Sequence, residues 1–234
     1  MMNDMQKGIV YGVGVGTGDP ELMTLKAVRL IRENHVIAVP GKSAEDSKAY
    51  KIAVQSVPEL ANKELVPVDM PMTKDTKKLT KAHQSGADLI KSYLDKGINV
   101  VYLTIGDPTV YCSFSYLQHI LEKDNYVVEL VSGVASFCAA AARLGITLCE
   151  GEEKLHILPS APCGNNVTVN DDSAVYAILK TGRDLNNVKS CFSQSYYNIY
   201  AVENIGTKDE RIFRNSEEFP EKSDYFTTII ARKK

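Results

Sequence analysis

Hydrophobic and polar positions follow two alternating periods along the first half of the chain. Residues 8–15 form a β-branched run that is typical of a buried strand. Residues 21–32 carry apolar side chains three or four positions apart, from Leu22 to Ile31, which is the spacing of one helix face. Residues 35–39 are again strand-like. The segment therefore predicts a strand, a helix and a second strand in succession.

The alternation continues with further predicted helices and strands. Helices are predicted over residues 44–57, 79–96 and 114–122, and strands over residues 65–68 and 98–105. Strands separated by helices pair in parallel through right-handed crossovers, which predicts a doubly wound sheet. In such a sheet a ligand binds beyond the carboxyl ends of the strands.

The pattern changes after about residue 120. A strand over 126–131 and a small-residue helix over 135–144 precede strand-like segments at 155–158, 174–180, 198–203, 210–214 and 225–232. One further helix is predicted near 184–194, and so few crossovers favour antiparallel pairs. We therefore predict two α/β domains, residues 1–119 with a mostly parallel sheet and residues 120–234 with a mixed sheet.

Two glycine-rich loops follow predicted strands. The first reads Gly12-Val-Gly-Val-Gly-Thr-Gly-Asp-Pro20, and the second reads Gly106-Asp-Pro-Thr-Val-Tyr111. The first is not a dinucleotide fingerprint, because Thr17 and Asp19 occupy the positions where that motif requires its third glycine, and no P-loop lysine follows. Backbone without side chains lets a ligand approach closely, so the two loops together predict one small-molecule site. A structural tight turn is the alternative for either loop alone.

Composition and charge limit which binding partners, location and metal content we expect for this protein. A net charge of -2 over 234 residues provides no general attraction to nucleic acid or to an anionic membrane. Apolar runs are too short to cross a bilayer, and the first residues lack a signal pattern, so we expect a cytoplasmic protein. The five cysteines have no metal-binding spacing, so reduced thiols and no protein-bound metal are expected. Lysines at 74, 77, 78 and 81 are interpreted as a solvated helix face.

Three segments carry a family resemblance. The two glycine loops resemble the signature loops of the tetrapyrrole methylases, which use S-adenosylmethionine. The segment Ser132-Gly-Val-Ala-Ser-Phe-Cys-Ala-Ala-Ala-Ala-Arg-Leu-Gly145 is similar to the branch that methylates C-20 of precorrin-2 or cobalt-factor II in cobalamin biosynthesis. The resemblance covers nearly the whole chain. It implies two α/β domains with the cofactor in the cleft between them, the tetrapyrrole in a trough beside it, and a homodimer.

The resemblance also implies site residues. Cofactor contacts are expected at Thr17, Ile105, Gly106, Asp107, Val110, Ala135, Ser136, Leu179, Lys180, Gly206 and Thr227. The substrate carries many carboxylates, and contacts with it are expected at Asp19, Arg143 and Arg183. Thr17 departs from the Pro of many relatives, and Cys112 stands where Ser is common. For Asp107, capping of its own turn is the alternative to a cofactor contact.

Methyl transfer from a sulfonium to carbon is an in-line displacement that requires neither a metal nor a covalent nucleophile. The protein then contributes proximity, orientation and exclusion of water. Tyr111 and Ser113 are expected to orient the macrocycle or relay a proton, with packing of Tyr111 under its loop as the alternative. No general base is predicted. The alternative functions are methylation at another ring carbon and a non-catalytic cofactor-binding module of the same fold.

Overall fold

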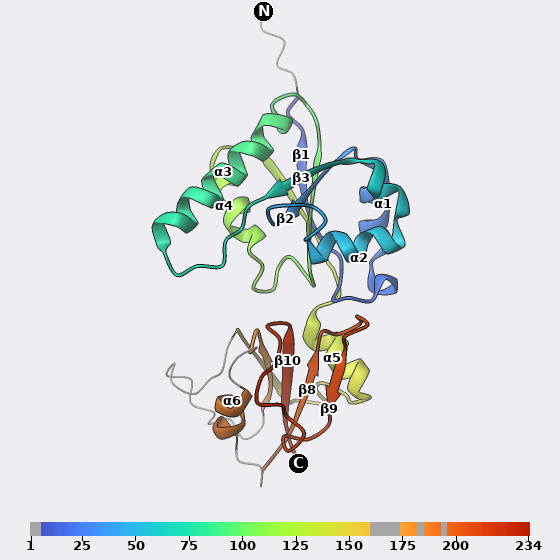
Figure 1. Ribbon diagram of the computed structural model, residues 1–234, viewed down its shortest axis with the longest axis vertical. Helices are drawn as coiled ribbons and strands as arrows, with labels where there is room; N and C mark the ends of the chain where they lie inside the picture. Colours follow the sequence, from blue (N-terminus) through green and yellow to red (C-terminus); the bar gives the residue numbers. More distant parts are fainter. Residues whose placement is uncertain (1–5, 160–173, 182–184, 193–195) are drawn as a thin grey trace, which may run out of the picture. The chain divides into compact units, whose positions relative to one another are not determined.

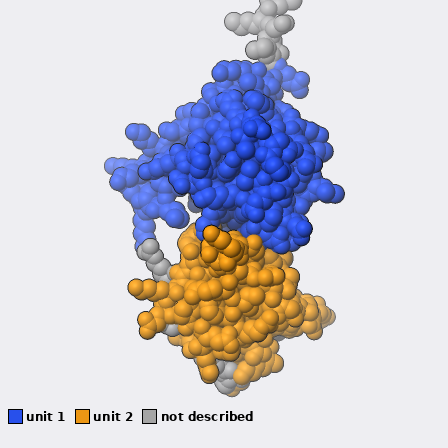
Figure 2. Space-filling view, turned by 45° about the vertical axis from the view of Figure 1, so that its right-hand side comes forward, with its two compact units in different colours: residues 1–134 blue, residues 135–234 orange. Residues whose placement is uncertain are grey.

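The computed structural model describes residues 6–159, 174–181, 185–192 and 196–234. The chain divides into two compact units, Met1–Val134 and Ala135–Lys234, which Figures 1 and 2 show. This division falls later than the predicted boundary at 119/120. The physical reason is that the strand Val127–Val131 pairs with the first strand of the chain and so completes the first sheet.

The first unit contains a five-stranded parallel sheet in the order β3-β2-β4-β1-β5. Its strands are β1 (Ile9–Gly14), β2 (Val36–Pro40), β3 (Glu64–Val68), β4 (Val100–Thr104) and β5 (Val127–Val131). Its helices are α1 (Leu25–Glu33), α2 (Lys48–Ser56), α3 (Thr76–Leu94) and α4 (Phe114–Lys123), with short 3-10 turns η1 (Pro20–Leu22) and η2 (Pro58–Asn62).

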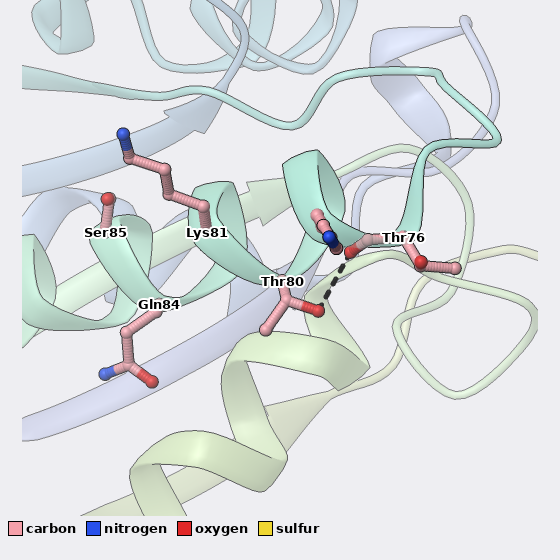
Figure 3. Close-up of a pocket in the computed structure, with 6 residues that line it drawn as sticks. Thr76, Thr80, Lys81, Gln84 and Ser85 are labelled. Atoms are coloured by element: carbon pink, nitrogen blue, oxygen red, sulfur yellow. Dashed lines mark hydrogen bonds between the residues drawn. The ribbon is translucent and has the colours of Figure 1, made fainter.

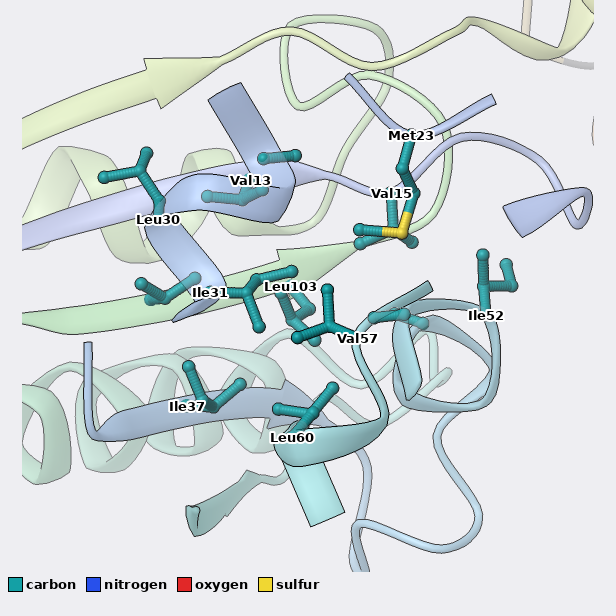
Figure 4. Close-up of a cluster of buried hydrophobic side chains, with 14 of the residues drawn as sticks. Val13, Val15, Met23, Leu30, Ile31, Ile37, Ile52, Val57, Leu60 and Leu103 are labelled. Atoms are coloured by element: carbon teal, nitrogen blue, oxygen red, sulfur yellow. The ribbon is translucent and has the colours of Figure 1, made fainter. Parts of the chain in front are cut away.

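Helices cover both faces of this sheet because successive strand side chains point to opposite sides. On β4, Val101 and Leu103 join the hydrophobic cluster beneath α1 and α2, part of which Figure 4 shows. Val100 and Tyr102 join the cluster beneath α3 and α4 on the other face. The predicted doubly wound arrangement is therefore confirmed (Figure 1).

Strands β1 and β4 are neighbours in the sheet, and the chain segments that follow them lead to opposite edges of the sheet. The chain leaves β1 through α1 toward β2, whereas it leaves β4 through α4, on the opposite face, toward β5. Such a reversal of strand order opens a crevice at the carboxyl ends of the two strands. The loops that follow β1 and β4 are the two predicted glycine loops.

Local capping divides the helix predicted over residues 21–32. Asp19 caps the short turn η1 by accepting a hydrogen bond from the Glu21 amide at 2.8 Å, with Pro20 in the first position. Thr24 then caps α1 separately, because its hydroxyl accepts from the Ala27 amide at 3.2 Å. The turn η1 therefore belongs to the loop after β1 rather than to the helix.

The second unit contains a mixed sheet in the order β6-β7-β10-β8-β9. Its strands are β6 (Lys154–Leu158), β7 (Ala174–Leu179), β8 (Tyr197–Glu203), β9 (Arg211–Phe213) and β10 (Thr227–Lys233), and its helices are α5 (Ser136–Leu144) and α6 (Leu185–Cys191). Only the β6–β7 pair is parallel among these described strands. The two α/β units, with one parallel and one mixed sheet, confirm the predicted fold class.

Two further features bear on the composition-based expectations. No helix in the described ranges combines the length and the apolar character that a membrane span requires. Cys112, Cys138 and Cys149 are free thiols, whereas Cys191 is disulfide-bonded. The expectation of reduced thiols is therefore wrong for Cys191.

Candidate functional site

The two predicted glycine loops are joined directly at the carboxyl edge of the first sheet. The Gly106 amide donates to the Gly16 carbonyl at 2.6 Å, and the Gly16 amide donates to the Gly106 carbonyl at 3.4 Å. Just before this bridge, the Val15 amide donates to the Thr104 carbonyl at 2.9 Å. The loops after β1 and β4 therefore form one structural feature, and that they bind one ligand together stays a prediction.

A third loop, after β5, completes the feature. A Cβ atom on Gly133 would lie 2.8 Å from the Gly14 carbonyl carbon and closer still to the Gly106 carbonyl oxygen. A Cβ atom on Gly14 would lie 2.7 Å from the Gly133 amide nitrogen. These three glycines form what we call the glycine junction, and only glycine fits at Gly14 and Gly133. Neither was among the predicted contacts, although a glycine at or just beyond the ends of three neighbouring strands is the signal that identifies them.

Gly106 is the member of the glycine junction that faces open space. The residue is buried and has a φ of 72°, a conformation that favours glycine. Nothing lies within 4 Å of the position that its Cβ would take. Around it, Ile105 packs against the hydrophobic cluster beneath α1 and α2, and the Val110 amide closes a turn onto the Asp107 carbonyl at 3.2 Å. A ligand can therefore approach the main chain at Gly106.

Asp107 connects the loop after β4 to the loop after β5. Its Oδ1 accepts hydrogen bonds from the Thr109 amide at 2.8 Å and the Thr109 hydroxyl at 2.5 Å. Its Oδ2 accepts from the Gly133 amide at 3.1 Å. The structure therefore supports the capping role, in which the carboxylate orders the glycine junction. A direct contact with the cofactor stays a prediction and would use the remaining lone pairs.

We expect Asp107→Ala to loosen the loop after β5. All three hydrogen bonds to the carboxylate are lost, and leaving the Gly133 amide without its acceptor alone costs about 1–3 kcal/mol. Hydrogen exchange measured on the peptide that contains Gly133 is expected to accelerate. Thr109→Val is the matched control, because it removes the Oδ1–hydroxyl bond and leaves the Gly133 bond in place. Equal exchange in the two variants would contradict the connecting role of Asp107.

The other predicted residues of the first unit lie along these loops. The Thr17 hydroxyl is buried and has no hydrogen-bond partner in the described parts of the chain. The Asp19 carboxylate is already used as the cap of η1. The Tyr111 side chain is 46% exposed on a backbone with a φ of 45°, so it is not packed beneath its loop. Ser113 precedes α4 and is exposed.

Cys112 directly follows the second loop, and Tyr102 is a buried residue of β4, the strand before that loop. The Cys112 sulfur accepts from the Phe114 amide at 3.4 Å and lies 3.0 Å from the Thr104 hydroxyl oxygen, so the thiol assists the start of α4 as a serine hydroxyl would. Burial raises the pKa of Tyr102 well above its ordinary value, which keeps this phenol protonated. No group of acids, histidines or cysteines in the described ranges is arranged to hold a metal ion.

Four predicted cofactor residues gather at one end of the second sheet. Leu179 ends β7 and pairs with Thr228, beside Thr227 at the start of β10. Lys180 follows with a φ of 59°, and the neighbouring Thr181 hydroxyl donates to the Thr227 carbonyl at 3.3 Å. Gly206 lies in the turn after β8, whose last residue pairs with Thr227. Ala135 and Ser136 lie at the start of α5.

The two predicted substrate arginines differ in what the structure describes. Arg143 on α5 forms an ion pair with Glu210, and its Nε lies 2.9 Å from one carboxylate oxygen. Glu210 also accepts a hydrogen bond from the Gly206 amide at 2.7 Å. Arg143 therefore already holds the turn that contains Gly206, and its contact with substrate stays a prediction. Arg183 lies outside the described residues.

Comparisons with known proteins place this geometry in a family. The model of the tetrapyrrole (corrin/porphyrin) methylases matches residues 9–219. A protein of Methanocaldococcus jannaschii named a probable cobalt-precorrin-2 C(20)-methyltransferase is 35% identical over 99% of both chains. The precorrin-2 C(20)-methyltransferase of a Sinorhizobium species is 26% identical over 98% of this chain and 97% of its own.

Solved structures agree on the fold. The uroporphyrin-III C-methyltransferase of Thermus thermophilus, solved with S-adenosylhomocysteine, has a TM-score of 0.65 at 24% identity, covering 95% of this chain and 97% of that one. The cobalt-precorrin-4 methyltransferase structure has a TM-score of 0.68 at 18% identity, covering 95% and 94%. The family match over most of the chain and the full-length relative lead to one conclusion: this chain belongs to the tetrapyrrole (corrin/porphyrin) methylases.

Proposed function

We propose that this protein transfers a methyl group from S-adenosylmethionine to C-20 of precorrin-2 or cobalt-factor II in cobalamin biosynthesis. The observation that carries the proposal is the 35% identity, over 99% of both chains, to a relative named for that reaction. A second C(20)-methyltransferase, similar over 98% of this chain, adds support. The glycine junction provides a ligand-accessible backbone at the strand ends where such a site is expected.

The residues at the glycine junction fit the proposed methyl donor. Gly106 leaves a cradle that a Cβ would fill, and the Thr17 hydroxyl is a buried donor without a partner in the described ranges. Ile105, Gly106 and Val110 would hold the cofactor through their backbone, and the Asp107 carboxylate would keep their loop in place. When bound, S-adenosylmethionine would supply the electrophilic methyl group that the reaction transfers. The remaining predicted cofactor contacts are Thr17 itself and, in the second unit, Ala135, Ser136, Leu179, Lys180, Gly206 and Thr227.

The protein's contribution to the reaction is positional. A meso carbon of the tetrapyrrole is electron-rich and needs no activation by a covalent nucleophile, so binding and orientation lower the barrier. Loops held by backbone contacts and by the Asp107 carboxylate provide a preorganised surface for this purpose. Exposed Tyr111 is proposed to orient the macrocycle, and Ser113 lies two residues beyond it. Asp19, Arg143 and Arg183 stay proposed substrate contacts.

The decisive experiment is a methylation assay with product mapping. Purified protein is incubated with S-adenosylmethionine and either metal-free precorrin-2 or cobalt-factor II, and the methylated carbon is located by NMR. Methylation at C-20 is expected, and the faster of the two substrates identifies the metal state that the enzyme uses. Methylation only at another ring carbon would contradict the C-20 assignment. No methylation of either substrate would favour a non-catalytic module.

Two further properties are part of the proposal. We expect a homodimer, as the family resemblance implies, and sedimentation equilibrium of the purified protein measures it. We also propose a cytoplasmic location, and fractionation of cells that express the tagged protein tests it.

A further inference from the structure

The chain passes from the first unit to the second only once, after Val134. Residues 132–135, which we call the linker, connect β5 to α5. The linker contains Gly133 of the glycine junction. Its last residue, Ala135, and the adjoining Ser136 are two of the predicted cofactor contacts. The linker therefore joins the glycine junction directly to the start of α5.

The first half of the linker is held by two other segments of the first unit. The Gly133 amide donates to the Asp107 carboxylate, in the loop after β4, at 3.1 Å. The Ser132 carbonyl accepts a hydrogen bond from the Thr24 hydroxyl, at the start of α1, at 3.4 Å. One side chain from the segment after β1 and one from the segment after β4 thus fix two successive residues of the linker.

The second half of the linker belongs to α5. The Ala135 carbonyl accepts from the Cys138 and Ala139 amides, both at 3.1 Å, and so forms part of the first turn of the helix. Only Val134 lies between the residues that the first unit holds and the residues that α5 holds. A displacement of Gly133 is therefore transmitted to the start of α5 through a single residue.

The Thr24 hydroxyl makes two different hydrogen bonds. It accepts from the Ala27 amide at 3.2 Å, which caps α1, and it donates to the Ser132 carbonyl. A hydroxyl can do both because it has one donor and two lone pairs, whereas a carboxylate can only accept. The capping role and the linker contact can therefore be separated by substitution. Thr24 was not among the predicted site residues.

We propose that Thr24 is a positioning residue for the cofactor site. Its hydroxyl, together with the Asp107 carboxylate, fixes the linker and so places Ala135 and Ser136 for contact with S-adenosylmethionine. This inference rests on the proposed function, because the cofactor contacts on α5 are part of that function. Thr24 acts through the linker and does not touch the reacting atoms. A small displacement of binding groups weakens a ligand without unfolding the protein.

The test uses one variant and two controls. Thr24→Asp keeps the cap of α1, since Asp is a good N-cap residue, and removes the donor to Ser132. Thr24→Ser keeps both hydrogen bonds. Thr80→Asp makes the same change at an exposed threonine whose hydroxyl donates to the Thr76 carbonyl of its own helix at 2.9 Å, beside a hollow of about 510 Å³ (Figure 3).

We expect amide hydrogen exchange of the linker peptides to accelerate in Thr24→Asp and to stay parental in both controls. Exchange within α1 and the Tm are expected to stay parental in Thr24→Asp, because the helix cap is kept. Calorimetric titration with S-adenosylhomocysteine is expected to give a Kd about threefold to tenfold higher in Thr24→Asp, the effect of one lost hydrogen bond. Both controls should keep the parental Kd.

Three outcomes would overturn the inference: linker exchange in Thr24→Asp that equals the parent, faster exchange confined to α1, or a Kd that rises equally in Thr80→Asp. Faster linker exchange with a parental Kd would overturn it as well, because the linker would then not position the cofactor contacts. Methylation at C-20 enters none of these measurements, so failure of that assignment leaves the inference standing. Absence of S-adenosylhomocysteine binding by the parent protein would instead contradict the proposed function.

Discussion

Replacing Gly133 with alanine is expected to disrupt the glycine junction and abolish cofactor binding. The new Cβ would lie 2.8 Å from the Gly14 carbonyl carbon and closer still to the Gly106 carbonyl oxygen. Both neighbours are backbone atoms, one at the end of β1 and one in the loop after β4, so neither can rotate away as a side chain could. Overpacking of this kind costs about 1–3 kcal/mol. Relief of the clash requires the loops after β1, β4 and β5 to separate.

Two measurements check this expectation. The chain has no tryptophan, so thermal unfolding is followed by far-UV circular dichroism, and a lower Tm is expected for Gly133→Ala. Calorimetric titration with S-adenosylmethionine is expected to give no detectable binding. Ser132→Ala is the neighbouring control, because that side chain is exposed. Parental Tm and affinity in Gly133→Ala would show that the three loops do not depend on their close approach.

A double variant tests whether Gly14 and Gly133 contribute to stability through the same contact. A Cβ on Gly14 would also collide with the Gly106 carbonyl oxygen and would lie 2.7 Å from the Gly133 amide. In both substitutions the new Cβ collides with the Gly106 carbonyl oxygen. Once one substitution has separated the loops of the glycine junction, the second should therefore cause little further loss of stability. We therefore expect the loss of stability in Gly14→Ala/Gly133→Ala to be smaller than the sum of the two single losses. Strict additivity would indicate two independent sites.

The second large effect is expected for Gly106→Ala. Gly106 and Gly145 form a matched pair, because their φ angles are 72° and 69° and neither has an atom within 4 Å of its Cβ position. Alanine in this left-handed conformation costs about 1–2 kcal/mol at either site. Both variants should therefore lose similar stability. Only at Gly106 would the methyl group enter the space proposed for the cofactor.

We expect Gly106→Ala to weaken S-adenosylmethionine binding at least tenfold, which corresponds to about 1.4 kcal/mol. Gly145→Ala should keep the parental Kd, since Gly145 only ends helix α5. Calorimetry measures both affinities, and circular dichroism measures both Tm values. A similar Kd in the two variants would mean that the open side of Gly106 is not where the cofactor lies. This pair separates backbone strain from the loss of ligand space, which a bulkier replacement would combine.

Much of the fold could be predicted because each element is encoded locally. The apolar spacing from Leu22 to Ile31 and the β-branched run at residues 8–15 appear as α1 and β1 with small shifts at their ends. The boundary between the units differed because it depends on which strand β5 pairs with. Strand β5 joins β1 across more than a hundred residues, and no local periodicity records that choice.

Within the site, the sequence by itself determined the two glycine loops and the family that they resemble. Close approach of a ligand to the main chain requires glycine at particular positions, and the amino-acid sequence shows those glycines directly. Only the tertiary structure decided that the loops meet in one glycine junction with Gly133, and that the Asp107 carboxylate connects its own turn to the Gly133 amide. The physical reason is distance along the chain. These contacts join residues separated by tens of positions, and they form only when the parallel sheet brings the carboxyl ends of β1, β4 and β5 to a common edge.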